Sequence, residues 1–70
     1  MNIKAIISSI NLTDQTAELI LPELDNAVTA PLPFYNRTVT AEERPGLIGT
    51  FVVLMVFGQD YNDGVIFLRG

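Results

Sequence analysis

The chain has 70 residues and a mass of 7.7 kDa, which allows a single domain spanning residues 1–70. Hydrophobic residues make up 49% of the chain and charged residues 17%, which is too apolar for a disordered protein. The chain has no cysteine and no histidine, which removes disulfides, thiolate metal sites and most hydrolase and metalloenzyme mechanisms. We therefore expect no enzyme activity and no cofactor.

The charge balance argues against nucleic acid and membranes as partners. Four basic residues stand against eight acidic ones, giving a net charge of −4, and the basic residues are far apart in the sequence. The longest apolar stretch, residues 47–57, is interrupted by Gly49 and Thr50 and falls short of the ~20 residues that span a bilayer. The start of the chain lacks the apolar run of a secretion signal, so we expect a cytoplasmic location.

The first third of the chain predicts two strands. Residues 1–10 are rich in isoleucine and read as the first strand, followed by a polar turn over residues 11–15. In residues 16–21 the side chains of Ala17, Leu19 and Leu21 fall on one face, which is typical of a half-buried strand. The proline that follows ends this strand, because proline cannot donate a hydrogen bond to a sheet.

The next segment reads as a weak third strand. Asp25-Asn26 predicts a turn, and residues 27–34 are extended in character. Because this segment contains Pro31 and Pro33, it can form only an edge strand or a short one.

A short helical turn is predicted before the fourth strand. Thr40 and Glu43 have the spacing of a capping box, in which each side chain bonds the backbone of the other residue. This spacing predicts a turn over residues 41–44, and we expect Pro45 to stop it early.

Residues 50–57 are the strongest strand of the chain, and both of its faces are apolar. One face carries Val52, Leu54 and Val56, and the other carries Phe51, Val53, Met55 and Phe57. The second face has two interpretations: it completes the core, or it is an interface with another subunit. We take Phe51, Val53, Met55 and Phe57 as the candidate interface. A turn over residues 58–63 and a strand over residues 64–68 complete five predicted strands, which favours a small closed or partly open barrel.

Four short motifs follow the order of one known family. They are residues 21–25 (Leu-Pro-Glu-Leu-Asp), Leu32-Pro33, residues 45–49 and residues 58–66. Their turn and motif positions are Pro45, Gly49, Gly58, Asp60 and Gly64. With this pattern the chain resembles the oligonucleotide/oligosaccharide-binding (OB) domain of phage baseplate assembly protein V and of the valine–glycine-repeat spike proteins of type VI secretion. It departs from the family pattern at Gln59, where the usual turn has a second glycine, and it has no tryptophan before Leu32.

The resemblance implies an all-β, five-stranded OB-like barrel with at most one short helical turn before strand four. It implies a non-enzymatic structural component of a phage or phage-derived tail or baseplate. The expected partners are further copies of the chain, with a trimer favoured, and other tail or baseplate proteins. The expected location is the cytoplasm of the producing bacterial cell and then the virion tail or a tail-like particle.

Two further readings concern possible sites. The run from Asp60 to Gly64 resembles a calcium loop only superficially, because Gly64 and Val65 occupy the fifth and sixth positions; we expect a hairpin turn instead, with Gly64 at positive φ. The alternative function is an OB-type binding module for single-stranded nucleic acid or another ligand, with Tyr35, Arg37 and Tyr61 available for stacking on bases.

Overall fold

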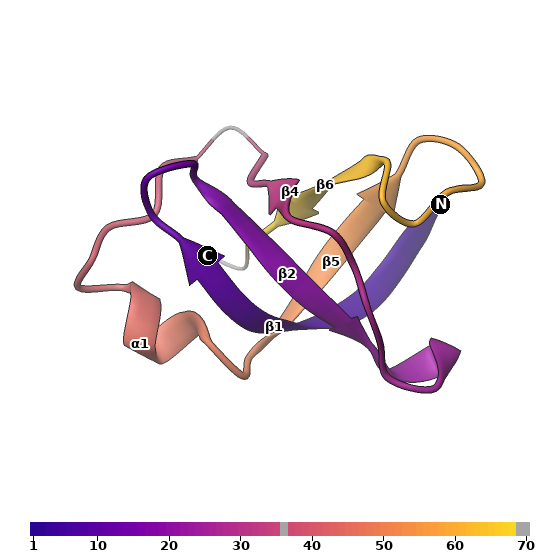
Figure 1. The fold of residues 1–70 in the computed structure, drawn as a ribbon, viewed down its shortest axis with the longest axis horizontal. Coiled ribbons are helices and arrows are strands. Elements are labelled where there is room, and N and C mark those ends of the chain that lie inside the picture. The colour runs from indigo at the N-terminus through magenta and orange to yellow at the C-terminus, as the bar shows by residue number, and fades with distance from the viewer. Residues whose placement is uncertain (36, 69–70) are drawn as a thin grey trace.

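The computed structural model describes residues 1–35 and 37–68, and its main feature is one antiparallel sheet of six strands (Figure 1). The strand order is β3-β2-β1-β5-β6, and β4 pairs with β2 beside β3. In chain order the elements are β1 (Asn2–Asn11), β2 (Thr16–Leu21), the 3-10 turn η1 (Pro22–Leu24), β3 (Ala27–Val28), β4 (Leu32–Pro33), α1 (Arg44–Leu47), β5 (Phe51–Val56) and β6 (Gly64–Phe67).

The long central strand β1 joins the two halves of the sheet. Its residues 2–6 pair with β5, and its residues 6–11 pair with β2. The register with β2 shifts between Ile7 and Ser9, so one extra residue forms a β-bulge there. A bulge bends its strand, which is why β1 can follow both neighbours as the sheet curves (Figure 1). The predictions of strands over residues 1–10 and 16–21 are confirmed.

The prediction of five strands is wrong by one, and the sheet is not closed by a continuous ladder. The segment 27–34 forms two strands of two residues each, β3 and β4. Pro31 lies between them and has no N–H to offer the ladder. Beyond β4 a single parallel bridge joins Phe34 to Ile66 of β6, and the N–H of Tyr35 donates to the Ile66 carbonyl at 2.8 Å.

The helical turn lies later than predicted, because Pro45 helps to start it instead of stopping it. α1 covers Arg44–Leu47 with Pro45 in its first turn, where a backbone N–H has no partner within the helix and proline is therefore tolerated. The predicted capping box is confirmed. The N–H of Glu43 donates to Thr40 Oγ1 at 3.3 Å, and the N–H of Thr40 donates to Glu43 Oε1 at 3.2 Å.

Two glycines are required for different reasons. Gly49 connects α1 to β5 with φ of 86°, and its N–H donates to the Ile7 carbonyl at 2.8 Å. Gly64 does not have the positive φ that the sequence predicted. Instead, a Cβ atom at this position would lie 2.3 Å from the carbonyl oxygen of Met55 on the paired strand, so only glycine allows β5 and β6 to approach this closely.

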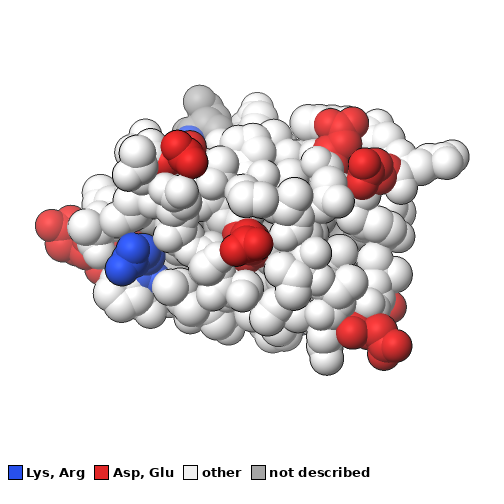
Figure 2. All heavy atoms as spheres, viewed as in Figure 1, with Lys and Arg blue, Asp and Glu red and all other residues white. Residues whose placement is uncertain are grey.

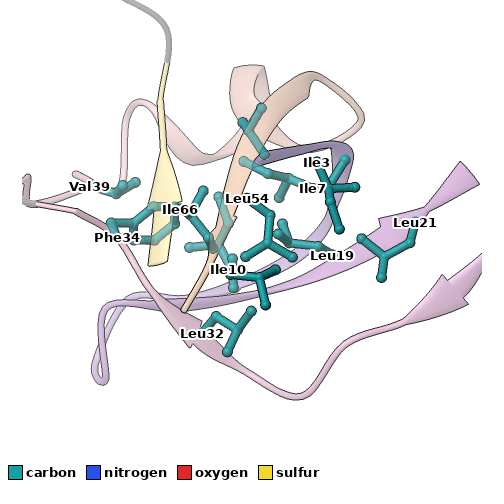
Figure 3. Close-up of a cluster of buried hydrophobic side chains, with 14 residues drawn as sticks. Ile3, Ile7, Ile10, Leu19, Leu21, Leu32, Phe34, Val39, Leu54 and Ile66 are labelled. Carbon is teal, nitrogen blue, oxygen red and sulfur yellow. The ribbon is translucent and has the colours of Figure 1, made fainter. Parts of the chain in front are cut away.

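The core lies on the inner side of the curved sheet (Figure 3). The buried hydrophobic residues are Ile3, Ala5, Ile7, Ile10, Ala17, Leu19, Leu21, Leu32, Phe34, Val39, Val52, Leu54, Val56 and Ile66. Leu19, Leu54 and Ile66 have no exposed surface at all. The inward faces that alternation predicted for residues 16–21 and 50–57 are confirmed.

The connection between β4 and α1 is held in place by the buried Val39 side chain and by hydrogen bonds between the Gln15 side chain and the Val39 backbone. Val39 belongs to no strand, yet it is buried in the core. Gln15 Oε1 accepts a hydrogen bond from the Val39 N–H at 2.7 Å, and Gln15 Nε2 donates one to the Val39 carbonyl at 3.0 Å. This side chain therefore pairs with the loop as a neighbouring strand would, and it fixes the route by which the chain reaches β5.

We predict that Gly64→Ala destabilises the protein by about 1–3 kcal/mol, because the new methyl group must push β6 away from the Met55 carbonyl. The measurement is urea unfolding followed by circular dichroism. The matched control is Gly46→Ala in α1, where a methyl group meets no atom within 4 Å. Equal stability of the two variants would contradict the close approach.

The capping box makes stability depend on pH. The hydrogen bond from the Thr40 backbone N–H, with help from the Thr40 hydroxyl and Arg37, lowers the pKa of the Glu43 carboxyl. A lowered pKa in the folded state adds stability that is present above the unfolded-state pKa and is lost as pH falls through the folded-state pKa. We predict that Glu43→Gln reduces unfolding stability at pH 7 and that this difference shrinks by pH 3. A difference that stays constant between these pH values would show that the Glu43 charge contributes nothing.

Candidate functional site

The outer face of β5 is exposed apolar surface. Phe51 is 48% exposed, Val53 40% and Phe57, just after the strand, 64%, while Met55 is partly buried. The interpretation that this face completes the core is therefore wrong for Phe51, Val53 and Phe57. The second interpretation, an interface, stays a prediction. We call Phe51, Val53, Met55 and Phe57 the β5 face.

Strand pairing extends the β5 face across the sheet, because residues paired in an antiparallel ladder point to the same side. Phe51 pairs with Ile6, and Ile6 pairs with Ile20 of β2. Ile20 in turn pairs with Val28 of β3, which is 58% exposed. We call this set, Val28, Ile20, Ile6 and Phe51, the apolar row. It crosses four strands without a polar residue.

An aromatic pair extends the β5 face on its other side. Val53 pairs with Phe67 of β6, so both side chains lie on the outer face. The Phe67 ring stacks on Tyr35, with ring centroids 4.5 Å apart. Tyr35 is more than half exposed. This stack adds further apolar surface beyond β6.

One charged group stands within this apolar surface. Lys4 pairs with Val53, and its Nζ lies 4.4 Å from the centroid of the Phe51 ring, in the position of a cation–π contact. Two shallow hollows flank the Phe51 ring. The first, about 350 Å³, is lined by Lys4, Phe51, Val52 and Val53. The second, about 340 Å³, is lined by Leu47, Thr50, Phe51, Val52 and Leu68. Phe51 therefore borders both hollows.

Beyond the bulge, the outer face of the same sheet is polar. Ser9 pairs with Glu18 there, and the Ser9 hydroxyl donates to Glu18 Oε1 at 2.9 Å. Asn11 pairs with Thr16 one step further along. The contrast shows that the apolar row is a local feature and does not extend over the whole outer surface of the sheet.

The turn after β5 is held by hydrogen bonds to the side chain and the backbone of Asp60. Asp60 Oδ1 accepts the N–H of Asn62 at 2.9 Å, and the N–H of Asp63 donates to the Asp60 carbonyl at 3.0 Å. The expected hairpin turn between β5 and β6 is confirmed, although Gly64 does not have the positive φ expected there. Gly58 begins this turn. Within residues 1–35 and 37–68, no three acidic side chains gather closely enough to hold a metal ion.

The three residues considered for base stacking have separate roles. Tyr35 stacks on Phe67, as described above, and Arg37 forms an ion pair with the Glu43 carboxylate. Tyr61 is partly buried against the core. The visible face in Figure 2 carries scattered acidic side chains and few basic ones. A basic groove that could follow a phosphate backbone does not arise from these residues.

Comparison with models of protein families, with curated proteins and with solved structures gives no match for this chain. The resemblance to the baseplate family, which rests on the motifs of the sequence, therefore stays a prediction. In the described part of the chain, no helix has the length and apolar character needed to cross a bilayer.

Sequence reasoning identified the β5 face but not its surroundings. Lys4, Ile6, Ile20 and Phe67 were not singled out, although alternation along their strands places each of them opposite the buried residues. What alternation lacks is the register, because only the pairing brings Lys4 beside Val53 and Ile6 beside Phe51.

We predict that Phe51→Asp keeps the native strand content and lowers the monomer's stability by only about 1 kcal/mol, since half of the ring is already in water. The adjacent Val52→Asp is the control, because Val52 is 3% exposed and an unpaired charge there should cost more than about 4 kcal/mol. For both variants, far-UV circular dichroism measures the strand content, and urea unfolding at low protein concentration measures the stability of the monomer. Unfolding of the Phe51→Asp monomer would place the ring in the core.

Proposed function

We propose that this protein is a non-enzymatic structural module that assembles through its β5 face. The observation that carries the proposal is the exposed apolar surface. Phe51 and Val53 on the outer side of β5, and Phe57 just after it, are partly exposed, while the inner side of the strand is buried. Contiguous apolar surface on a small protein marks an interaction site more often than a chance exposure.

The area of this exposed surface sets how much free energy a partner gains by covering it. The exposed parts of Phe51 and Phe57 together amount to about one whole aromatic side chain, or roughly 200 Å². Burying that area contributes about 5 kcal/mol. Association costs about 4–15 kcal/mol in lost freedom of motion, so these two rings alone give little net affinity. A stable assembly therefore needs the apolar row and the Tyr35–Phe67 stack to be covered as well.

We propose further that the sheet is a partly open barrel of the OB type. The order β3-β2-β1-β5-β6 ends at β6, and β4 pairs with β2 off this path. The parallel bridge from Phe34, directly after β4, to Ile66 of β6 joins the two edges of the sheet. Contacts between β4 and β6 support the same closure. An OB barrel is five-stranded and partly open, and β3 with β4 together correspond to its third strand.

The biological setting that we propose is a phage or phage-derived tail or baseplate, with further copies of this chain and other tail proteins as partners. The support is the resemblance of the motifs at residues 21–25, 32–33, 45–49 and 58–66 to the baseplate assembly protein V family. In that setting the module is made in the bacterial cytoplasm and ends in the tail, and the homo-oligomer is a trimer.

We predict that the wild-type chain is an oligomer that persists at both low and high salt at protein concentrations well above its dissociation constant, because burial of apolar surface is the main force that holds it together. Phe51→Asp should dissociate this oligomer to folded monomers. Light scattering coupled to size-exclusion chromatography gives the mass, and circular dichroism checks the fold. Met55→Ala is the comparison variant. Because the Met55 side chain is already partly buried in the monomer, we expect this variant to weaken the oligomer less than Phe51→Asp does.

The alternative, a binding module for single-stranded nucleic acid, gives a different result in the same experiment. A monomer at all concentrations that retains single-stranded DNA at low salt and releases it at high salt would support that alternative and contradict the assembly proposal.

A further inference from the structure

Lys4 restricts what can cover the β5 face. Its ammonium group lies over the Phe51 ring, and it is the only charged side chain in the paired positions around that ring and Val53. Among residues 1–35 and 37–68 the one ion pair is that between Arg37 and Glu43, so Lys4 has no carboxylate partner there. A partner that covers the face removes water from Lys4, and a buried ammonium without a counter-charge is strongly unfavourable.

A two-fold contact through this face does not provide the counter-charge. In such a contact the same surface patch meets itself. The face contributes Lys4 and no carboxylate, so two copies would bring two ammonium groups into one dry interface. Like charges brought together in this way oppose association. The covering surface must therefore be a different one, with an apolar group beside a carboxylate.

The η1 turn of the same chain offers such a surface. Leu24 is 37% exposed, and the acidic residues Glu23 and Asp25 that flank it are exposed too. The turn is stiff, because Pro22 begins it and Asp25 adopts left-handed backbone angles at its end. In Figure 1 it projects from one end of the molecule, away from α1. It is an apolar tip with carboxylates on both sides.

We propose that the η1 tip (Glu23, Leu24 and Asp25) of one copy docks into the hollow lined by Lys4, Phe51, Val52 and Val53 of the next copy. Leu24 packs against the Phe51 and Val53 side chains, and the Glu23 carboxylate pairs with the Lys4 ammonium, as one part of an interface that also covers the apolar row and the Tyr35–Phe67 stack. The proposal rests on the proposed function and names the partner surface that the function needs. The apolar groups and the charges match, and the net charge of −4 means that carboxylates are plentiful on the chain while the β5 face is locally positive.

This contact is heterologous, since two different surfaces meet. Heterologous contacts generate closed rings when the rotation closes and filaments when it does not, and the same contact exchanged in both directions gives a two-fold dimer. In the trimer proposed above the contact closes a ring, in which every η1 tip and every β5 face is occupied.

A charge swap tests the contact directly. In the full chain, Lys4→Glu and Glu23→Lys should each raise the dissociation constant of the oligomer at least about tenfold, and the double variant should recover to within about threefold of wild type. Sedimentation velocity over a range of concentrations gives these constants. The control is Glu42→Lys, which makes the same charge change as Glu23→Lys at another exposed position. Circular dichroism confirms each fold. If Lys4→Glu does not fold, Lys4→Gln replaces it, and the test is then that Glu23→Gln weakens assembly in the wild-type background but not in the Lys4→Gln background.

The outcomes separate the contact from the proposed function. Loss of assembly in both single variants with recovery in the double variant supports the contact. An oligomer that is dissociated by Phe51→Asp but unaffected by Lys4→Glu, or one that the double variant fails to restore, overturns the contact and leaves the proposed function intact. A wild-type chain that never assembles overturns the proposed function itself.

Discussion

The structure depends on one constraint: β5 is apolar on both faces, and a chain of 70 residues covers only one of them. The inner face, with Leu54 fully buried, is needed to build the core, because the chain has no disulfide to replace it. The outer face then remains in water with the Phe51 ring partly exposed. The same strand therefore provides both the stability of the monomer and the surface that we propose for assembly.

The remaining elements keep β5 in place and limit its exposed surface. β1 pairs along β5 and carries Lys4 to the Phe51 ring, while the bulge near Ser9 marks the change to a polar outer face. Gly64 lets β6 lie close against β5. The hydrogen bonds between the Gln15 side chain and the Val39 backbone fix the loop that leads to α1 and the start of β5. Each contact is local, yet together they leave a bounded apolar row in place of a general hydrophobic surface.

Much of the fold follows from sequence patterns, and the failures have physical reasons. Alternation identified residues 16–21 and the inner face of β5, and the capping box of Thr40 and Glu43 needed only its spacing. The helical turn was predicted too early in the chain, because a proline can end a helix or begin one, and Pro45 begins α1. The sequence could not decide whether the face of Phe51 was covered, since two apolar faces look alike in a pattern. The position of Lys4 over Phe51 depends on strand register, which alternation along a single strand does not give.

The central claim is that the Phe51 ring is in water in the monomer and becomes covered on assembly. The chain has no tryptophan, so Phe51→Trp introduces a single fluorescent probe at this position. We expect an emission maximum typical of exposed indole at high dilution and a shift to shorter wavelength as the protein is concentrated. Emission typical of exposed indole at every concentration would mean that no other copy covers this face, and emission typical of buried indole even at high dilution would place the ring in the core.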